Sequence, residues 1–294
     1  MVLCPESDRP TVWLGLLANL LLMISGAANA DRFGAGFDRA EWRLSASELE
    51  CRLWQPIPNF GEGVFRQRAG EQEQFMLTAF QPVPAGDALV RIEPPTWRKQ
   101  AESSQLGTVS VKASDTPVML GDEFAGQLLS SLQQGLNPVF DQMAYPSLGG
   151  QASVSLVAVN FKRAYTDYQD CRSHLIPATY AEVSRTRIDY GPGQWELSDD
   201  EAAHLDLVVR HVEADPAIST IYVDGYSDAS GKRSTNLEIS KKRAEAVVHY
   251  LQQQGIPLER ITMRYHGSRY PVAPGFSAQA RAQNRRVTVR LEKG

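Results

Sequence analysis

Cysteine and histidine are scarce in this sequence, with three and five residues among 294. A structural zinc site needs four ligands, usually Cys or His at close spacing. No second cysteine pair stands near Cys51 or Cys171. His204 and His211 lie seven residues apart on one predicted helix, too far along it to chelate an ion together. We therefore predict no metal site.

The sequence also lacks an excess of basic charge and a recognisable catalytic pattern. Its 30 Lys and Arg against 34 Asp and Glu give a net charge of −4, which argues against a general nucleic-acid binder. A hydrolase built on Ser227, Asp228 and a histidine would need a nucleophile elbow or paired carboxylates, and the sequence shows neither pattern. We predict that the protein is not an enzyme and uses no cofactor.

One long apolar run needs an explanation, Thr11–Ile24. It is too short to span a bilayer comfortably, and an A-x-A cleavage signature follows it at 28–30. We predict a secretory signal peptide over 1–30. Glu6 and Asp8 outnumber the single arginine in the n-region, where positive charge is expected. An uncleaved anchor and a start upstream of the true one therefore stay open as alternatives.

Export would leave Cys51 and Cys171 as the two cysteines of the mature chain. An oxidising compartment favours one disulfide between them, and the alternative is two separate buried thiols. A bridge would close a loop of about 120 residues, worth roughly 4 to 5 kcal/mol by chain entropy. It would tie the beginning of one domain to its end.

The length indicates two domains, and residues 31–180 form the first of them. Short strand-like runs separated by Pro and Gly predict a mostly antiparallel β domain. These runs are ELECRLW, GVFRQR, EQFMLTAF, ALVRIEP, GTVSVKAS and ASVSLVAVNF. The one clear helix candidate is 122–134, where apolar residues recur at helical spacing. Because nothing here suggests catalysis, we interpret this part as an interaction domain.

Residues 181–294 alternate between strand and helix patterns, which predicts an α/β sandwich with helices packed on a sheet. A linker and a first strand lie within 175–190. A capping box at 198–201 opens a helix that ends before Pro216. A second strand and a second helix, closed by Gly255 and a proline, are followed by strands at 261–265 and 286–291. The whole chain is thus predicted to be α+β.

The stretch Ile221–Ala244 combines a strand, a polar loop with Asp228 and a helix with Arg243. Both signs of charge would converge on a small zwitterion. The stretch resembles the OmpA-like peptidoglycan-binding domain, with the internal spacing of that family's motif. The matching residues are Gly225, Tyr226, Ser227, Asp228, Gly231, Asn236, Ile239, Ser240, Arg243, Ala244, Asn284, Arg285, Arg286 and Val287.

That resemblance implies that Asp228 and Arg243 hold the diaminopimelate residue of the peptidoglycan stem peptide. A carboxylate suits the ligand ammonium, and a guanidinium forks onto its carboxylate. Taken singly, Asp228 is also typical of a residue that caps its own turn, and Arg243 of a solvated helix arginine. Tyr226 and Ser227 replace the family's usual His and Thr, which affects the finer contacts of the loop.

Four further site candidates carry simpler alternatives. Asn236 fits a helix N-cap as well as a ligand contact. Ser227 would often satisfy local backbone instead of a ligand. Arg285 and Arg286 point in different directions if both are strand-like, so at most one faces the ligand, with Arg285 slightly favoured; either also suits a surface ion pair. A Gly-, Pro- and Ala-rich loop within 265–284 is a candidate to cover part of the site.

The segment Cys51–Phe65, CRLWQPIPNFGEGVF, resembles the corresponding region of the MotY family. That resemblance implies a periplasmic flagellar motor protein whose β domain docks on the basal body, associates with a MotX-like ring protein and favours assembly of the stator complex. Its C-terminal domain would bind peptidoglycan. The alternatives are a general OmpA-like envelope anchor unrelated to motility and, in another class, a wall-remodelling enzyme.

Overall fold

The computed structural model describes residues 1–2, 31–98, 102–145 and 150–294. Nearly all of the predicted signal peptide, at 3–30, lies outside these residues. Within the described part, no helix has the length and apolar character needed to cross a membrane.

The first domain, called the β domain below, contains two five-stranded sheets. One has the order β1 (Asp31–Phe33), β10 (Gly150–Ser155), β9 (Asn137–Tyr145), β6 (Gly86–Glu93) and β7 (Ser104–Val111). The other has the order β2 (Arg43–Ala46), β3 (Glu50–Ile57), β4 (Gly61–Arg68), β5 (Gln74–Ala79) and β8 (Val118–Leu120). The β1–β10 pair is parallel and the other pairs are antiparallel, so the predicted mostly antiparallel domain is confirmed.

Both sheets contribute to one apolar core, which also includes two helices. The predicted helix is confirmed as α1 (Asp122–Gln133), with Leu128, Leu129 and Leu132 buried. A second helix, α2 (Phe161–His174), was not predicted, and the last strand-like run ends at Ser155 instead of reaching it. Because its buried face consists of Phe161, Tyr168 and Cys171 among polar residues, its helical period is weak in the sequence.

The strand β9 at the middle of its sheet was also missed. Pro138 lies in it, and Gln142 has a positive φ of 64° opposite an irregularity in the pairing with β10. A proline and a bulge both interrupt the alternation by which strands are recognised.

A disulfide joins Cys51 on β3 to Cys171 on α2, with 6.0 Å between the Cα atoms. The predicted bridge is confirmed, and the alternative of two separate thiols is wrong. Its effect is to fasten α2 to the sheet across 120 residues of sequence.

The second domain, called the α/β domain below, has a four-stranded sheet in the order β11 (Arg185–Asp189), β14 (Arg286–Lys293), β12 (Ile218–Gly225) and β13 (Ile261–Tyr265). Its helices are α3 (Tyr180–Val183), α4 (Asp199–Ala214), α5 (Arg233–Gln253), the 3-10 turn η2 (Leu258–Arg260) and α6 (Ala278–Asn284). Ser198 and Glu201 form the predicted capping box of α4. The apolar stripes of α4 and α5 share a core with alternate residues of the sheet, as an α/β sandwich requires.

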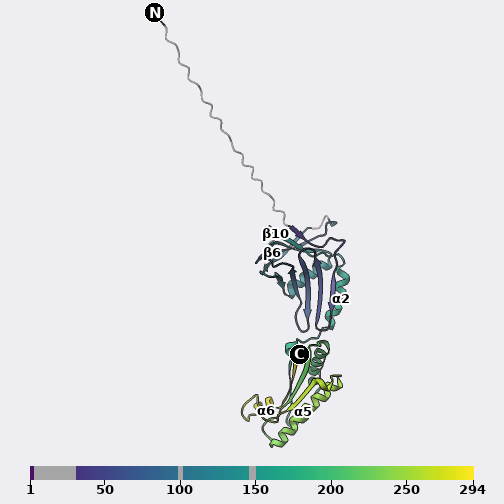
Figure 1. Ribbon diagram of the computed structural model, residues 1–294, viewed down its shortest axis with the longest axis vertical. Coiled ribbons are helices and arrows are strands. Elements are labelled where there is room, and N and C mark those ends of the chain that lie inside the picture. Colours follow the sequence, from purple (N-terminus) through teal and green to yellow (C-terminus); the bar gives the residue numbers. More distant parts are fainter. Residues whose placement is uncertain (3–30, 99–101, 146–149) are drawn as a thin grey trace.

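Figure 1 shows the two domains end to end along the longest axis. Arg210 of α4 reaches across to Glu48 of the β domain at 2.9 Å, and the Gly70 N–H donates to the Ile176 carbonyl. Gly70 has φ +69°, and a Cβ there would lie 2.4 Å from the Thr179 nitrogen, so only glycine fits at this crossing. The chain ends at this junction (Figure 1), so the opposite end of β14, at Arg286, points away from the β domain.

Candidate functional site

The candidate site lies at the end of the α/β domain remote from the β domain, in the loop between β12 and α5. At Gly225 the strand passes so close to α5 that a Cβ would lie 2.1 Å from the Ser240 carbonyl oxygen. The motif glycine therefore allows the strand and the helix to pack closely. The chain then turns through Asp228 into α5, which carries Arg243 back toward the loop.

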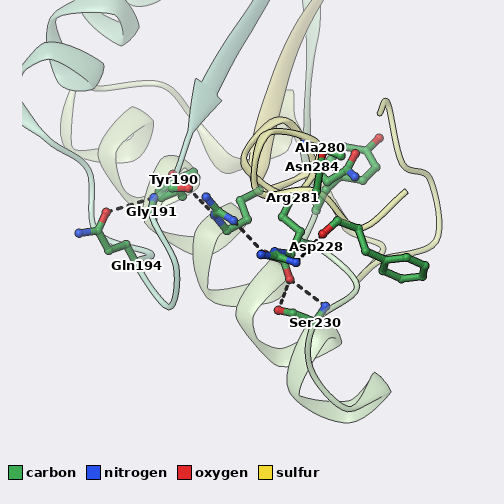
Figure 2. A network of polar contacts seen from close by, with 12 residues as sticks. Tyr190, Gly191, Gln194, Asp228, Ser230, Ala280, Arg281 and Asn284 are labelled. Carbon is green, nitrogen blue, oxygen red and sulfur yellow. Dashed lines mark hydrogen bonds and ion pairs between the residues drawn. The ribbon is translucent and has the colours of Figure 1, made fainter. Parts of the chain in front are cut away.

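Asp228 is 8% exposed and uses both carboxylate oxygens. Its Oδ1 accepts from the backbone N–H and the hydroxyl of Ser230, and its Oδ2 accepts from Arg285 Nη1 at 3.0 Å (Figure 2). Burial alone would raise the pKa of Asp228, but these contacts outweigh it and hold the pKa below its ordinary value. Asp228 thus caps its own turn, as the simpler alternative predicted, and also stays ionised beside a cation.

Arg243 is 1% exposed, so the alternative of a solvated helix arginine is wrong. Its Nε donates to the Gln194 carbonyl at 2.8 Å, Nη1 to the Tyr226 carbonyl at 3.0 Å and Nη2 to the Gly191 carbonyl at 3.2 Å. Its guanidinium also lies 5.0 Å from the centre of the Tyr190 ring. Burial lowers the pKa of Arg243 to about 10, which leaves it protonated at neutral pH. These contacts use three of its five N–H groups and leave two for a ligand.

The two adjacent arginines separate, as predicted. Arg285, at the end of α6, donates from Nε to the Tyr190 carbonyl and from Nη1 to Asp228. Arg286 begins β14 on the other side, where its guanidinium lies 3.8 Å from the centre of the Tyr226 ring and donates to the Tyr270 carbonyl. The structure therefore brings Arg285 into the site and leaves Arg286 outside it.

Asn236 and Ser227 complete the predicted set. The N-cap of α5 is Lys232, so the N-cap interpretation of Asn236 is wrong. Asn236 lies one turn into the helix and donates to the Gly231 carbonyl at 3.2 Å. Ser227 is 5% exposed, and its hydroxyl has no hydrogen-bond partner among the described residues. A buried hydroxyl without a partner is costly, and a ligand would satisfy it.

These side chains surround a cavity of about 200 Å³, called the stem cavity below. Its lining consists of Pro192, Gly193, Ser227, Asp228, Ser230, Gly231, Thr235, Asn236, Ile239, Arg243 and Arg285. Two guanidinium groups face one carboxylate there, so the wall favours a ligand carboxylate while still offering an acceptor to an ammonium group. The size suits the head group of one amino acid.

One wall of the stem cavity was missed by sequence reasoning. It is the loop after β11, of which Figure 2 shows Tyr190, Gly191 and Gln194. The Gly191 and Gln194 carbonyls accept from Arg243, and the Tyr190 carbonyl accepts from Arg285. The Gly-Pro-Gly run at 191–193 is a turn signal that marks this loop. The predicted cover from 265–284 is wrong: none of 266–284 lines the stem cavity, and 278–284 is helix α6.

Larger hollows lie elsewhere on the described surface. The largest of those identified, about 820 Å³, is in the β domain beside the start of α2. Its lining has three acidic residues, Asp38, Glu41 and Asp167, and three basic residues. The balance of charge therefore favours neither an anionic nor a cationic ligand. Among the described residues, no group of three or more His, Cys, Asp or Glu side chains is placed to hold a metal ion.

Comparison with known proteins gives matches to both domains. Residues 33–177 match the family described as the MotY N-terminal domain, and residues 190–285 match the OmpA family. The chain is 27% identical over 288 residues to the sodium-type flagellar protein MotY of Vibrio parahaemolyticus, covering 95% of this chain and 97% of that protein.

Other matches are confined to part of the chain. The peptidoglycan-associated lipoprotein of Pseudomonas putida is 32% identical over 95 residues, which cover 32% of this chain and 56% of that protein. Among solved structures, the peptidoglycan-associated lipoprotein from Burkholderia pseudomallei is 26% identical with a TM-score of 0.35, covering 36% of this chain and 89% of that chain.

Proposed function

Because this chain belongs to the MotY family of flagellar motor proteins, we propose that it links a ring on the flagellar basal body to peptidoglycan in the periplasm. In this proposal the α/β domain holds the diaminopimelate residue of a stem peptide in the stem cavity. The β domain holds the motor side, beside a MotX-like ring protein, and supports stator assembly. The protein acts by binding, without catalysis.

The observation that carries the proposal is the stem cavity itself. Arg285 and the two free N–H groups of Arg243 suit the carboxylate of a zwitterionic ligand centre. Asp228 retains lone-pair capacity for the ammonium group, and the Ser227 hydroxyl lacks a partner that such a ligand would provide.

The position of the stem cavity also supports a tether. Helix α6, whose C-cap Arg285 lines the stem cavity, lies at the end of the molecule away from the β domain (Figure 1), so the two domains can bind at once. A single small site of this kind binds weakly, and many copies in one ring would gain avidity without any new contact.

Asp228→Asn is expected to weaken binding to purified sacculi by roughly 10- to 100-fold, the value of one charge-assisted hydrogen bond. Asparagine keeps an oxygen for the Ser230 turn but loses the charge, so the fold is preserved. Because the pKa of Asp228 is depressed, wild-type binding should stay flat from about pH 8 to 5 and fall only below the ordinary carboxyl range.

The matched control is Glu238→Gln, which removes a carboxylate from the exposed face of α5. Co-sedimentation with sacculi across pH measures both variants. Wild-type affinity from Asp228→Asn, or a wild-type titration centred near neutral pH, would contradict the charge-pair proposal.

A swimming assay distinguishes the proposed motor function from the alternative of a general envelope anchor. We expect a clean deletion strain to carry flagella, counted by electron microscopy, and to swim poorly. Wild-type protein should restore swimming, and the Asp228→Ala, Arg243→Ala double variant should restore it weakly. Normal swimming of the deletion strain would remove the motor role and leave a wall-binding envelope protein.

A further inference from the structure

A second hollow adjoins the stem cavity, and we propose that it binds a sugar of the glycan strand that carries the stem peptide. This inference rests on the proposed function and adds a separate subsite to it. The hollow, called the loop cleft below, has a volume of about 480 Å³. Its lining consists of Asp189, Tyr190, Gly193, Gln194, Trp195, Glu196, Leu197, Ser198 and Glu201.

The loop cleft and the stem cavity lie on two sides of one loop. Gly193 lines both hollows, and Pro192 beside it lines the stem cavity. Arg243 holds this loop through the Gly191 and Gln194 carbonyls. The two hollows are therefore fixed relative to one another, and a ligand in one lies next to the other.

Trp195 gives the loop cleft an aromatic surface. It is 41% exposed, although tryptophan is usually well covered in a folded domain. An indole ring with a free face offers a flat apolar surface at little entropic cost, and the C–H face of a pyranose ring matches it. Exposed aromatic groups beside a polar hollow are typical of binding sites.

An unsatisfied hydroxyl independently indicates a ligand here. Tyr190 lines the loop cleft and is 5% exposed, and its Oη has no hydrogen-bond partner among the described residues. Burial, and then the nearby Glu201 carboxylate, raise the pKa of the Tyr190 phenol well above its ordinary value. The group is thus a neutral hydroxyl that lacks a partner, which native structures rarely leave unexplained.

The remaining lining suits sugar hydroxyls. Asp189 uses Oδ1 for Arg187, and Glu201 uses Oε2 for the capping box, which leaves one oxygen on each to accept from a ligand. Glu196 adds a third acceptor. Carboxylates beside an aromatic surface bind a neutral, hydroxyl-rich ring better than an anionic ligand, which they would repel.

The distance along peptidoglycan fits two adjacent subsites. Three extended residues span at most about 10 Å, so a sugar lies within a short reach of a diaminopimelate held in the stem cavity. One ligand can therefore occupy both hollows, and its two parts should bind cooperatively through their covalent link.

The test uses isothermal titration of the mature full-length protein with the free diaminopimelate-containing tripeptide and with the same tripeptide joined to its disaccharide. We expect the disaccharide to increase wild-type affinity by roughly tenfold, in the range of a stacked aromatic contact. Trp195→Ala should remove this gain and leave tripeptide affinity unchanged, and Trp195→Phe should retain most of it. Trp97→Ala, at an exposed tryptophan of the β domain, is the matched control.

The outcomes separate this inference from the proposed function. No binding of the tripeptide by the wild type would overturn the proposed function and the inference with it. Tripeptide binding with no gain from the disaccharide, or a gain that survives Trp195→Ala, would overturn the inference alone. Binding of an oligolysine peptide that Trp195→Ala abolishes, without a disaccharide effect, would assign the loop cleft to a basic protein segment instead.

Discussion

Arg243→Ala is expected to abolish detectable binding to sacculi and to lower the free energy of unfolding of the α/β domain by roughly 3 kcal/mol. The substitution removes the donors of three backbone carbonyls, on Gly191, Gln194 and Tyr226. Buried acceptors without partners are costly, and the loop that walls the stem cavity would lose its attachment. Stability and binding should therefore fall together.

Two further variants on α5 serve as a conservative substitution and as a control. Arg243→Lys keeps the charge, but a single ammonium group cannot supply the same fork of donors. We therefore expect a free energy of unfolding between those of Arg243→Ala and the wild type, and weak binding to sacculi. Lys241→Ala, on the exposed face of the helix, should behave as wild type. Thermal unfolding and sacculus co-sedimentation measure both properties. Unchanged stability with lost binding would mean that Arg243 contacts only the ligand, and retained binding would refute its place in the site.

The grouping of Asp228 with Arg243 could be predicted from the sequence because the two residues are close in the chain. Asp228 lies on the loop between β12 and α5, and Arg243 lies on α5, at the spacing of the motif that the stretch resembles. The acceptors of Arg243 at Gly191 and Gln194 lie 52 and 49 residues earlier in the chain and are backbone atoms. Backbone acceptors cannot be identified from the pattern of side chains in a sequence, so the structural role of Arg243 could be found only from the fold.

The strength of the local sequence signal also explains which parts of the fold were missed. Helices with strong apolar stripes or caps, such as α1 and α4, were predicted close to their bounds. The helices α2 and α6 have little apolar periodicity, and they are held by the disulfide and by the Ser277 cap with Asn284 bonded to the preceding loop. A covalent bridge, a cap and side-chain hydrogen bonds, more than apolar periodicity, determine these elements.

Replacing both Cys51 and Cys171 by alanine is expected to destabilise the β domain by about 4 to 5 kcal/mol. The bridge spans 120 residues, and it restricts the conformations of the unfolded chain. Because the entropy that it removes grows with loop length, its loss stabilises the unfolded state strongly. It also removes the covalent attachment of α2, whose buried face is small. For a domain of this size the loss corresponds to a fall in melting temperature of roughly 10 to 20 °C.

Calorimetry resolves which domain is affected, because Cys51 and Cys171 both lie in the β domain and its core is separate from that of the α/β domain. The double variant should lower the transition of the β domain and leave that of the α/β domain in place, with sacculus binding unchanged. Reduction of the wild type should reproduce the shift. A parallel fall of both transitions would show that the junction at Gly70 and Arg210 couples the two domains into one cooperative unit. In that case force on the wall-binding end would be resisted by the whole chain, and the bridge would stabilise the tether as well as the domain that contains it.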